Sequence, residues 1–67
     1  MAPIAFDRIR VGKKYYIQNL GEACRFEVEE KIADQNFKIK DLETLERYQL
    51  QDFVRYGLGK DFTLYEI

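Results

Sequence analysis

A chain of 67 residues has room for one domain, and a domain of this size buries only about 60% of the surface that its unfolded chain exposes. Five Phe and five Tyr cover large areas per residue, so we expect an aromatic core. Eleven basic and twelve acidic residues give a net charge of −1, whereas proteins that bind nucleic acid through its phosphates usually carry a basic excess. These totals predict a single domain over residues 1–67 and disfavour a generally basic nucleic-acid binder.

Two strands and a turn are predicted in the first third of the chain. Residues 14–20 are rich in β-branched and aromatic side chains, begin after Gly12 and end at Gly21. Residues 24–32 alternate apolar side chains at Cys24, Phe26, Val28 and Ile32 with charged ones. This period of two is typical of a strand with one buried face and one solvated face.

A hairpin partner for this second strand follows directly. The polar stretch 33–36 has turn chemistry, and residues 37–40 resume the alternation. Residues 44–50 predict a further strand, but the apolar spacing loses parity between Leu45 and Tyr48. A bulge or a bend is the physical way to absorb that slip.

One helical turn and a closing strand complete the predicted elements. Residues 52–57 resemble a single turn of helix, with Asp52 as its N-terminal cap and Gly57 in the left-handed conformation at its end. Residues 62–67 read as the last strand, and both of its faces carry apolar groups.

The predicted fold is therefore mainly β: a small barrel of four to five antiparallel strands with one short helical turn before the last strand. Closing the sheet would remove the exposed edges of so small a β protein. The alternative is an open meander with a terminal helix over about residues 42–56. Its apolar stripe is ragged, so the barrel is preferred.

The order of these elements resembles the Src-homology-three-like and Tudor-like small barrels over about residues 9–57. The Tudor pattern is matched by Val11-Gly12 at the first strand, Gly21-Glu22 before Arg25–Val28, Phe37–Asp41 at the third strand, and Leu50–Phe53 at the end of the fourth. The resemblance implies the barrel fold and an interaction role. Many members bind methylated side chains in an aromatic cage, but Leu42 and Glu43 stand where the family often has an aromatic residue and a glycine. No cage is assigned.

Catalytic and metal-binding residue sets are missing from the sequence. The chain has no histidine, which excludes histidine-based catalysis and histidine-ligated metal. Its one cysteine, Cys24, is in phase with the predicted buried face, so we expect a core residue rather than a nucleophile. Residues 57–60 contain two glycines and a lysine, but they lack the phosphate-loop spacing and read as a turn. The sequence predicts no enzyme, no metal and no cofactor.

The sequence also bears on where the protein is located and whether it contacts a membrane. No stretch approaches the roughly 18 apolar residues of a transmembrane helix, and the first residues lack the pattern of a secretory signal. A single cysteine excludes an internal disulfide and suits a reducing compartment. We expect a cytoplasmic protein without a membrane partner.

Exposed tyrosines and arginines carry the main functional hypothesis, a protein- or peptide-binding module, because these side chains are enriched at binding hot spots. Its candidate residues are Tyr16, Tyr48, Arg55, Tyr56 and Tyr65.

The alternative hypothesis is nucleic-acid binding by a basic N-terminal segment, with Tyr15 or Tyr16 stacking on bases. Its candidate patch is Arg8, Arg10, Lys13, Lys14 and Tyr15. An acidic stretch follows at residues 21–30, so these charges can also complement each other across the sheet. The identity of the partner and the oligomeric state are not predicted.

Overall fold

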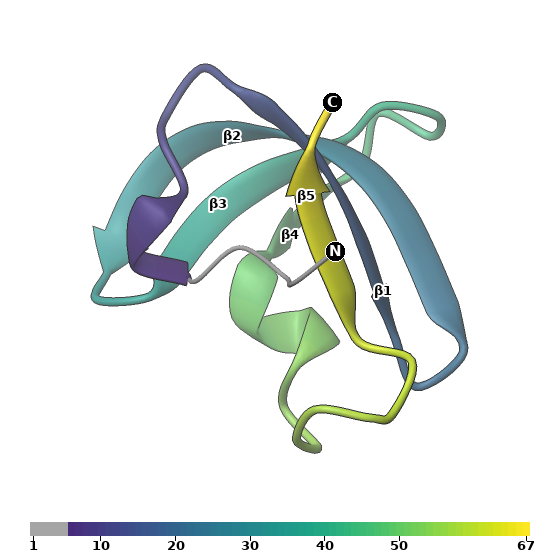
Figure 1. The fold of residues 1–67 in the computed structure, drawn as a ribbon. Coiled ribbons are helices and arrows are strands. Elements are labelled where there is room, and N and C mark those ends of the chain that lie inside the picture. Colours follow the sequence, from purple (N-terminus) through teal and green to yellow (C-terminus); the bar gives the residue numbers. More distant parts are fainter. Residues whose placement is uncertain (1–5) are drawn as a thin grey trace.

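A computed structural model, which describes residues 6–67, contains one antiparallel five-stranded sheet and two short 3-10 helices (Figure 1). No helix in these residues is long and apolar enough to cross a membrane. The predicted mainly β fold is confirmed. In chain order the elements are η1 (Phe6–Arg8), β1 (Lys14–Asn19), β2 (Glu22–Ala33), β3 (Asn36–Asp41), β4 (Arg47–Gln49), η2 (Leu50–Phe53) and β5 (Thr63–Glu66).

The strands lie in the order β4-β3-β2-β1-β5, so β5 returns to pair with β1 after the chain has passed through η2. The twelve-residue β2 pairs with β1 along one half and with β3 along the other. Figure 1 shows that the sheet is strongly curved and that η2 lies at one end of it. Within residues 6–67 no pairing joins β4 to β5, and closure into a barrel stays a prediction.

Alternating side chains of the strands form the core, as the period of two predicts. Tyr15 and Ile17 from β1 face inward with Cys24 and Phe26 from β2, and the rings of Tyr15 and Phe26 stack with centroids 5.8 Å apart. Burial of Cys24 confirms its predicted place in the core. The buried apolar residues are Ile9, Tyr15, Ile17, Cys24, Phe26, Val28, Phe37, Ile39, Leu50 and Leu64.

The predicted buried face of β2 ends earlier than expected. The register passes from Val28 opposite Ile39 to Lys31 opposite Phe37, with an irregularity between Val28 and Glu30. An extra residue of this kind reverses the parity of the side chains beyond it. Ile32 is consequently 42% exposed, and its predicted place on the buried face is wrong.

The break in apolar alternation between Leu45 and Tyr48 coincides with a turn before β4, not with a bulge inside a strand. Residues 42–44 form the turn, and Leu45 has a φ of 63°. Strand β4 therefore covers only 47–49 instead of the predicted 44–50. Because β4 and η2 occupy this interval, the alternative terminal helix over residues 42–56 is wrong.

The helical turn begins two residues before its predicted start. Asp52 is the third residue of η2, not its cap, and its Oδ2 accepts a hydrogen bond from the Gln49 amide at 3.2 Å. The carboxylate thus fixes the helix start from within the turn. Gly57 has a φ of 94°, which confirms its left-handed conformation.

Asn19 joins the end of β1 to the connection between η2 and β5. Its side chain is 2% exposed, and Nδ2 donates to the carbonyls of Phe53 (2.6 Å) and Gly57 (3.0 Å). Its Oδ1 accepts from the Gly59 amide at 2.8 Å. One buried amide therefore satisfies three main-chain groups of this connection.

Asp61 holds the same connection from the other side. Its carboxylate accepts hydrogen bonds from the amides of Leu20 and Gly21, each at 2.9 Å, in the turn between β1 and β2. These main-chain donors lower the pKa of Asp61, with Gly21 the largest contributor. Asn19 and Asp61 together fix where β5 begins.

Candidate binding sites

The five residues predicted for protein binding fall into three separate groups. Tyr16 and Tyr65 lie together, Tyr48 lies against Phe53, and Arg55 lies beside Tyr56. The structure does not bring them into one site. Each group has its own surroundings and its own chemistry.

Tyr16 and Tyr65 form a pair on the outer face of the sheet. They are directly opposite each other in the β1–β5 register, with ring centroids 5.1 Å apart and planes 30° from parallel. Arg25 lies opposite Tyr16 on β2, and Tyr65 is 37% exposed. The Tyr16 hydroxyl donates to Gln18 Oε1 at 3.0 Å, which holds its ring along the strand. This face offers flat aromatic contact area.

Arg55 and Tyr56 form a surface pair after η2. The Arg55 Nη2 donates to Asp52 Oδ1 at 2.9 Å, and the guanidinium lies 5.9 Å from the Tyr56 ring centroid. Hydrogen bonding with Tyr56, followed by Asp52, raises the pKa of Arg55. Tyr56 is 82% exposed, so this pair presents an open surface rather than a pocket.

Tyr48 lies in a pocket that combines aromatic rings with carboxylates. The cavity measures about 430 Å³ and is called the acidic–aromatic pocket below. The Tyr48 and Phe53 rings form two of its walls, with centroids 6.4 Å apart and planes at 88°. The start of β2, the end of β3, β4 and η2 contribute its lining: Glu22, Ala23, Cys24, Asp41, Tyr48, Asp52 and Phe53.

Hydrogen bonds favour the ionised form of Asp41, which lines this pocket. Its Oδ1 accepts from the amides of Thr44 (3.1 Å) and Glu43 (2.7 Å), which lowers the pKa of the carboxyl. The Cys24 thiol donates to Asp41 Oδ2 at 3.4 Å. Burial, then this hydrogen bond and the charge of Asp41, raise the pKa of Cys24 to about 12. The cysteine is therefore a neutral thiol at physiological pH, and Asp41 supplies the negative charge.

The lining of the pocket suits a cation. Aromatic faces attract cations through the ring quadrupole, and the carboxylates of Glu22 and Asp41 add a negative field. Asp52 is already paired with Arg55, but Glu22 has no ion-pair partner within 4.0 Å in the described part of the chain. Desolvation and the nearby Glu46 carboxylate raise the pKa of the Tyr48 phenol, so the ring stays neutral.

The predicted basic patch is present only in part, because Tyr15 is not a surface ring. Tyr15 is 2% exposed and stacked on Phe26, so its predicted role in stacking on bases is wrong. Its hydroxyl reaches the lining of a cavity of about 390 Å³, together with Asp7, Arg8, Arg10 and Glu66. Lys13 and Lys14 lie exposed in the following turn and at the start of β1.

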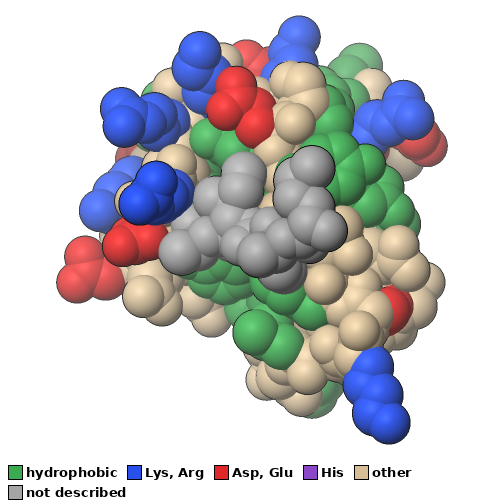
Figure 2. Space-filling view, viewed as in Figure 1, with side chains coloured by type: hydrophobic (Ala, Val, Ile, Leu, Met, Phe, Trp, Pro, Cys, Tyr) green, Lys and Arg blue, Asp and Glu red, His purple; other side chains and the backbone are tan. Residues whose placement is uncertain are grey.

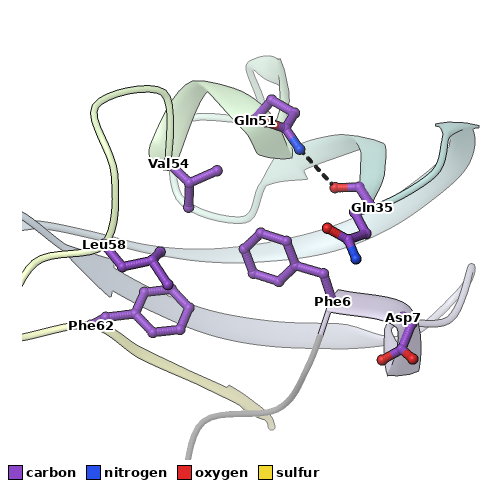
Figure 3. Close-up of a pocket in the computed structure, with 7 residues that line it drawn as sticks. All are labelled: Phe6, Asp7, Gln35, Gln51, Val54, Leu58 and Phe62. Carbon is purple, nitrogen blue, oxygen red and sulfur yellow. Dashed lines mark hydrogen bonds between the residues drawn. The ribbon is translucent and has the colours of Figure 1, made fainter.

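A more apolar cavity of about 540 Å³ lies between η1, η2 and the segment before β5. Figure 3 shows Phe6 and Phe62 facing each other, with Leu58 and Val54 beside them. The ring centroids of Phe6 and Phe62 are 6.1 Å apart. Across its rim Gln51 Nε2 donates to the Gln35 carbonyl at 3.0 Å. The Asp7 carboxylate points away from the rings. The cavity offers apolar contact, but no charged group converges on it to select a ligand.

Sequence reasoning missed Phe53, Asp41 and Glu22 as pocket residues. Phe53 reaches Tyr48 only because a four-residue 3-10 helix follows β4 at once, and that geometry leaves no periodic signal. Asp41 was visible as the polar end of the third strand, which is the one available clue. Within residues 6–67, no group of three His, Cys, Asp or Glu side chains is arranged to hold a metal ion. Comparison with protein families, curated proteins and solved structures found no match to this chain.

Proposed function

We propose that this protein is a non-catalytic protein- or peptide-binding module whose acidic–aromatic pocket receives an arginine side chain of its partner. The observation that carries the proposal is the perpendicular pair of Tyr48 and Phe53 rings beside the carboxylates of Asp41 and Glu22. An interaction module needs no convergent catalytic groups, and the neutral thiol of Cys24 is a poor nucleophile. The free thiol suits a reducing compartment, and the proposal places the module in the cytoplasm.

Arginine fits the pocket better than lysine for two physical reasons. The guanidinium is planar and weakly hydrated, so it stacks on an aromatic face at a lower desolvation cost than an ammonium group. It also donates charge-assisted hydrogen bonds to carboxylates, and Asp41 is held ionised by two main-chain amides on Oδ1, which leaves Oδ2 as the acceptor for the guanidinium. One ring for stacking and one oriented carboxylate is the arrangement that this side chain recognises.

The resemblance to Tudor-like and Src-homology-three-like barrels is consistent with this role. Five antiparallel strands with a 3-10 helix between the fourth and fifth, and with β5 beside β1, support that resemblance at the level of the fold. The rings of this pocket come from β4 and η2, not from the positions that follow Asp41. The chemistry of the pocket itself is therefore the basis for the proposed ligand.

The proposal is tested by titrating the full chain with a blocked Gly-Ser-Arg-Ser-Gly peptide and following the aromatic and amide resonances by NMR. We expect shifts at Tyr48, Phe53 and Asp41. Tyr48→Leu and Phe53→Leu should each weaken binding by about tenfold, since a desolvated cation–π contact contributes up to about 2 kcal/mol. The matched control is Tyr56→Leu, which removes an exposed ring outside the pocket and should leave the affinity unchanged.

Two results would argue against the arginine pocket. One is a set of shifts confined to Tyr16 and Tyr65, which would move the binding surface to the outer face of the sheet. The other is an affinity that Tyr56→Leu lowers as much as Tyr48→Leu does. Urea unfolding of each variant separates loss of binding from loss of the fold.

A further inference from the structure

Two arginines border a cavity at the end of the molecule where β1 starts. Arg8 is the last residue of η1, Arg10 follows it in the connection to β1, and both line the cavity of about 390 Å³. Tyr15 from β1 and Glu66 from β5 lie opposite each other in the sheet register and contribute the inner wall. We call this space the Arg8–Arg10 cavity. The acidic–aromatic pocket lies toward the other end of β1, where Glu22 pairs with Asn19.

The Tyr15 hydroxyl brings an unused hydrogen-bond donor to the inner wall. Its oxygen accepts from the Arg10 amide at 2.9 Å, while the ring is almost wholly buried. Among residues 6–67 the hydroxyl donates no hydrogen bond of its own. A phenol can donate one hydrogen bond while accepting another. An oxygen atom of a ligand in this cavity would satisfy it.

The two arginines of this cavity are free to pair with a ligand. In the described part of the chain, Arg8 and Arg10 have no ion-pair partner within 4.0 Å, and neither do Lys13 and Lys14. Figure 2 shows Lys and Arg side chains gathered at the upper left, over η1 and the turn that follows it. Asp7 and Glu66 share the lining, so its charges are balanced, and Lys13 and Lys14 follow in the chain outside it.

We propose that the Arg8–Arg10 cavity binds a phosphate group. The two guanidinium groups pair with its oxygens in the forked geometry that arginine offers to phosphate, and the Tyr15 hydroxyl donates a third hydrogen bond. The tyrosine that the sequence placed in a stacking role thus acts through its hydroxyl instead of its ring. The phosphate belongs either to a small molecule or to the backbone of single-stranded nucleic acid, because both present the same oxygens.

The experiment is an NMR titration of the full chain with sodium phosphate, compared with sodium chloride at the same ionic strength. Phosphate should shift the resonances of Arg8, Arg10 and Tyr15 to saturation, and chloride should not. Arg10→Gln and Tyr15→Phe should each lower the phosphate affinity by about tenfold or more, the size of one charge-assisted hydrogen bond. Tyr15→Phe retains the buried ring, so the core remains filled.

Two further variants make the test specific to this cavity. Glu66→Gln removes a negative charge from the rim and should tighten phosphate binding, which is the opposite direction to Arg10→Gln. Lys60→Gln changes the net charge by the same amount as Arg10→Gln, on an exposed residue that does not line the cavity, and should leave the affinity unchanged.

A second titration, with a mixed-sequence single-stranded oligonucleotide at two salt concentrations, identifies the source of the phosphate. Competition between oligonucleotide and phosphate for the same resonances, with affinity falling steeply as salt rises, assigns a nucleic-acid backbone. Phosphate binding without oligonucleotide binding assigns a small phosphorylated molecule. The proposal is overturned if neither ligand shifts Arg8, Arg10 and Tyr15, or if Arg10→Gln and Lys60→Gln have equal effects.

Discussion

Replacing Asn19 by alanine removes the side chain that connects β1 to the segment before β5. The substitution leaves the carbonyls of Phe53 and Gly57 and the amide of Gly59 without their hydrogen-bond partner in a buried place. A protein hydrogen bond contributes about 1 kcal/mol net, so three of them amount to about 3 kcal/mol. A domain of this length has a free energy of unfolding of about 3–10 kcal/mol, from about 0.05–0.15 kcal/mol per residue. Asn19→Ala should therefore remove a third or more of the stability.

Urea unfolding, followed by far-ultraviolet circular dichroism, measures the free energy of unfolding of Asn19→Ala. The matched control is Asn36→Ala, because the Asn36 amide bonds Gln49 and Gln51 at the exposed rim and its loss should cost under about 1 kcal/mol. The reasoning would be refuted if Asn19→Ala lost no more stability than Asn36→Ala. Such a result would mean that the connection satisfies its main-chain groups in another way.

Three further predictions concern charge, thiol reactivity and strand register. Main-chain donors lower the pKa of Asp61, so its contribution to stability is present above the unfolded value of about 3.9 and is lost as the pH falls through the lower folded value. The urea midpoint of Asp61→Asn should consequently lie below that of the wild type near neutral pH and converge with it in acid, and a constant difference at all pH values would contradict this. The Cys24 thiol, with a pKa of about 12, should resist iodoacetamide at pH 8 until urea unfolds the chain, whereas rapid alkylation of the native protein would show an exposed thiolate. Ile32→Thr should change the free energy of unfolding by under about 0.5 kcal/mol, because Ile32 is exposed. Ile39→Thr should lower it by at least about 2 kcal/mol, because Ile39 is buried. Equal losses in the two variants would place Ile32 in the core.

Local patterning was enough to predict the strands of the first two thirds of the fold. Alternation from Cys24 to Val28 and from Phe37 to Ile39 matches the buried face that the structure shows. Such alternation is readable because each strand buries one face. It fails at Ile32, because an extra residue in β2 reverses the parity without leaving a mark in composition.

Contacts between distant segments were beyond the reach of the sequence. The bonds from Asn19 to the Gly57–Gly59 segment join positions about forty residues apart, and no local propensity encodes them. The contact of Tyr48 with Phe53 is closer in sequence, but it depends on the short 3-10 helix that ends at Phe53. The sequence therefore predicted candidate binding residues, and the fold decides which of them share a pocket.

Tyr15 shows how the sequence pattern and the fold together determine the role of a residue. Sequence reasoning placed it in a basic patch as a stacking ring, and the inward alternation of β1 buries that ring while leaving its hydroxyl at a cavity wall. Tyr15 lines one cavity with Arg8 and Arg10, but the role of its side chain depends on which face of the strand it occupies.

The central claim is that the acidic–aromatic pocket recognises a positively charged guanidinium. The most direct measurement compares, by calorimetry on the wild-type chain, the affinity of the Gly-Ser-Arg-Ser-Gly peptide with that of its citrulline counterpart, which has nearly the same shape and no charge. The account predicts that the arginine peptide binds at least about tenfold more tightly, since loss of the charge removes both the cation–π contact and the charged pairing with Asp41. Equal affinities for the two peptides, or no binding of either, would contradict it.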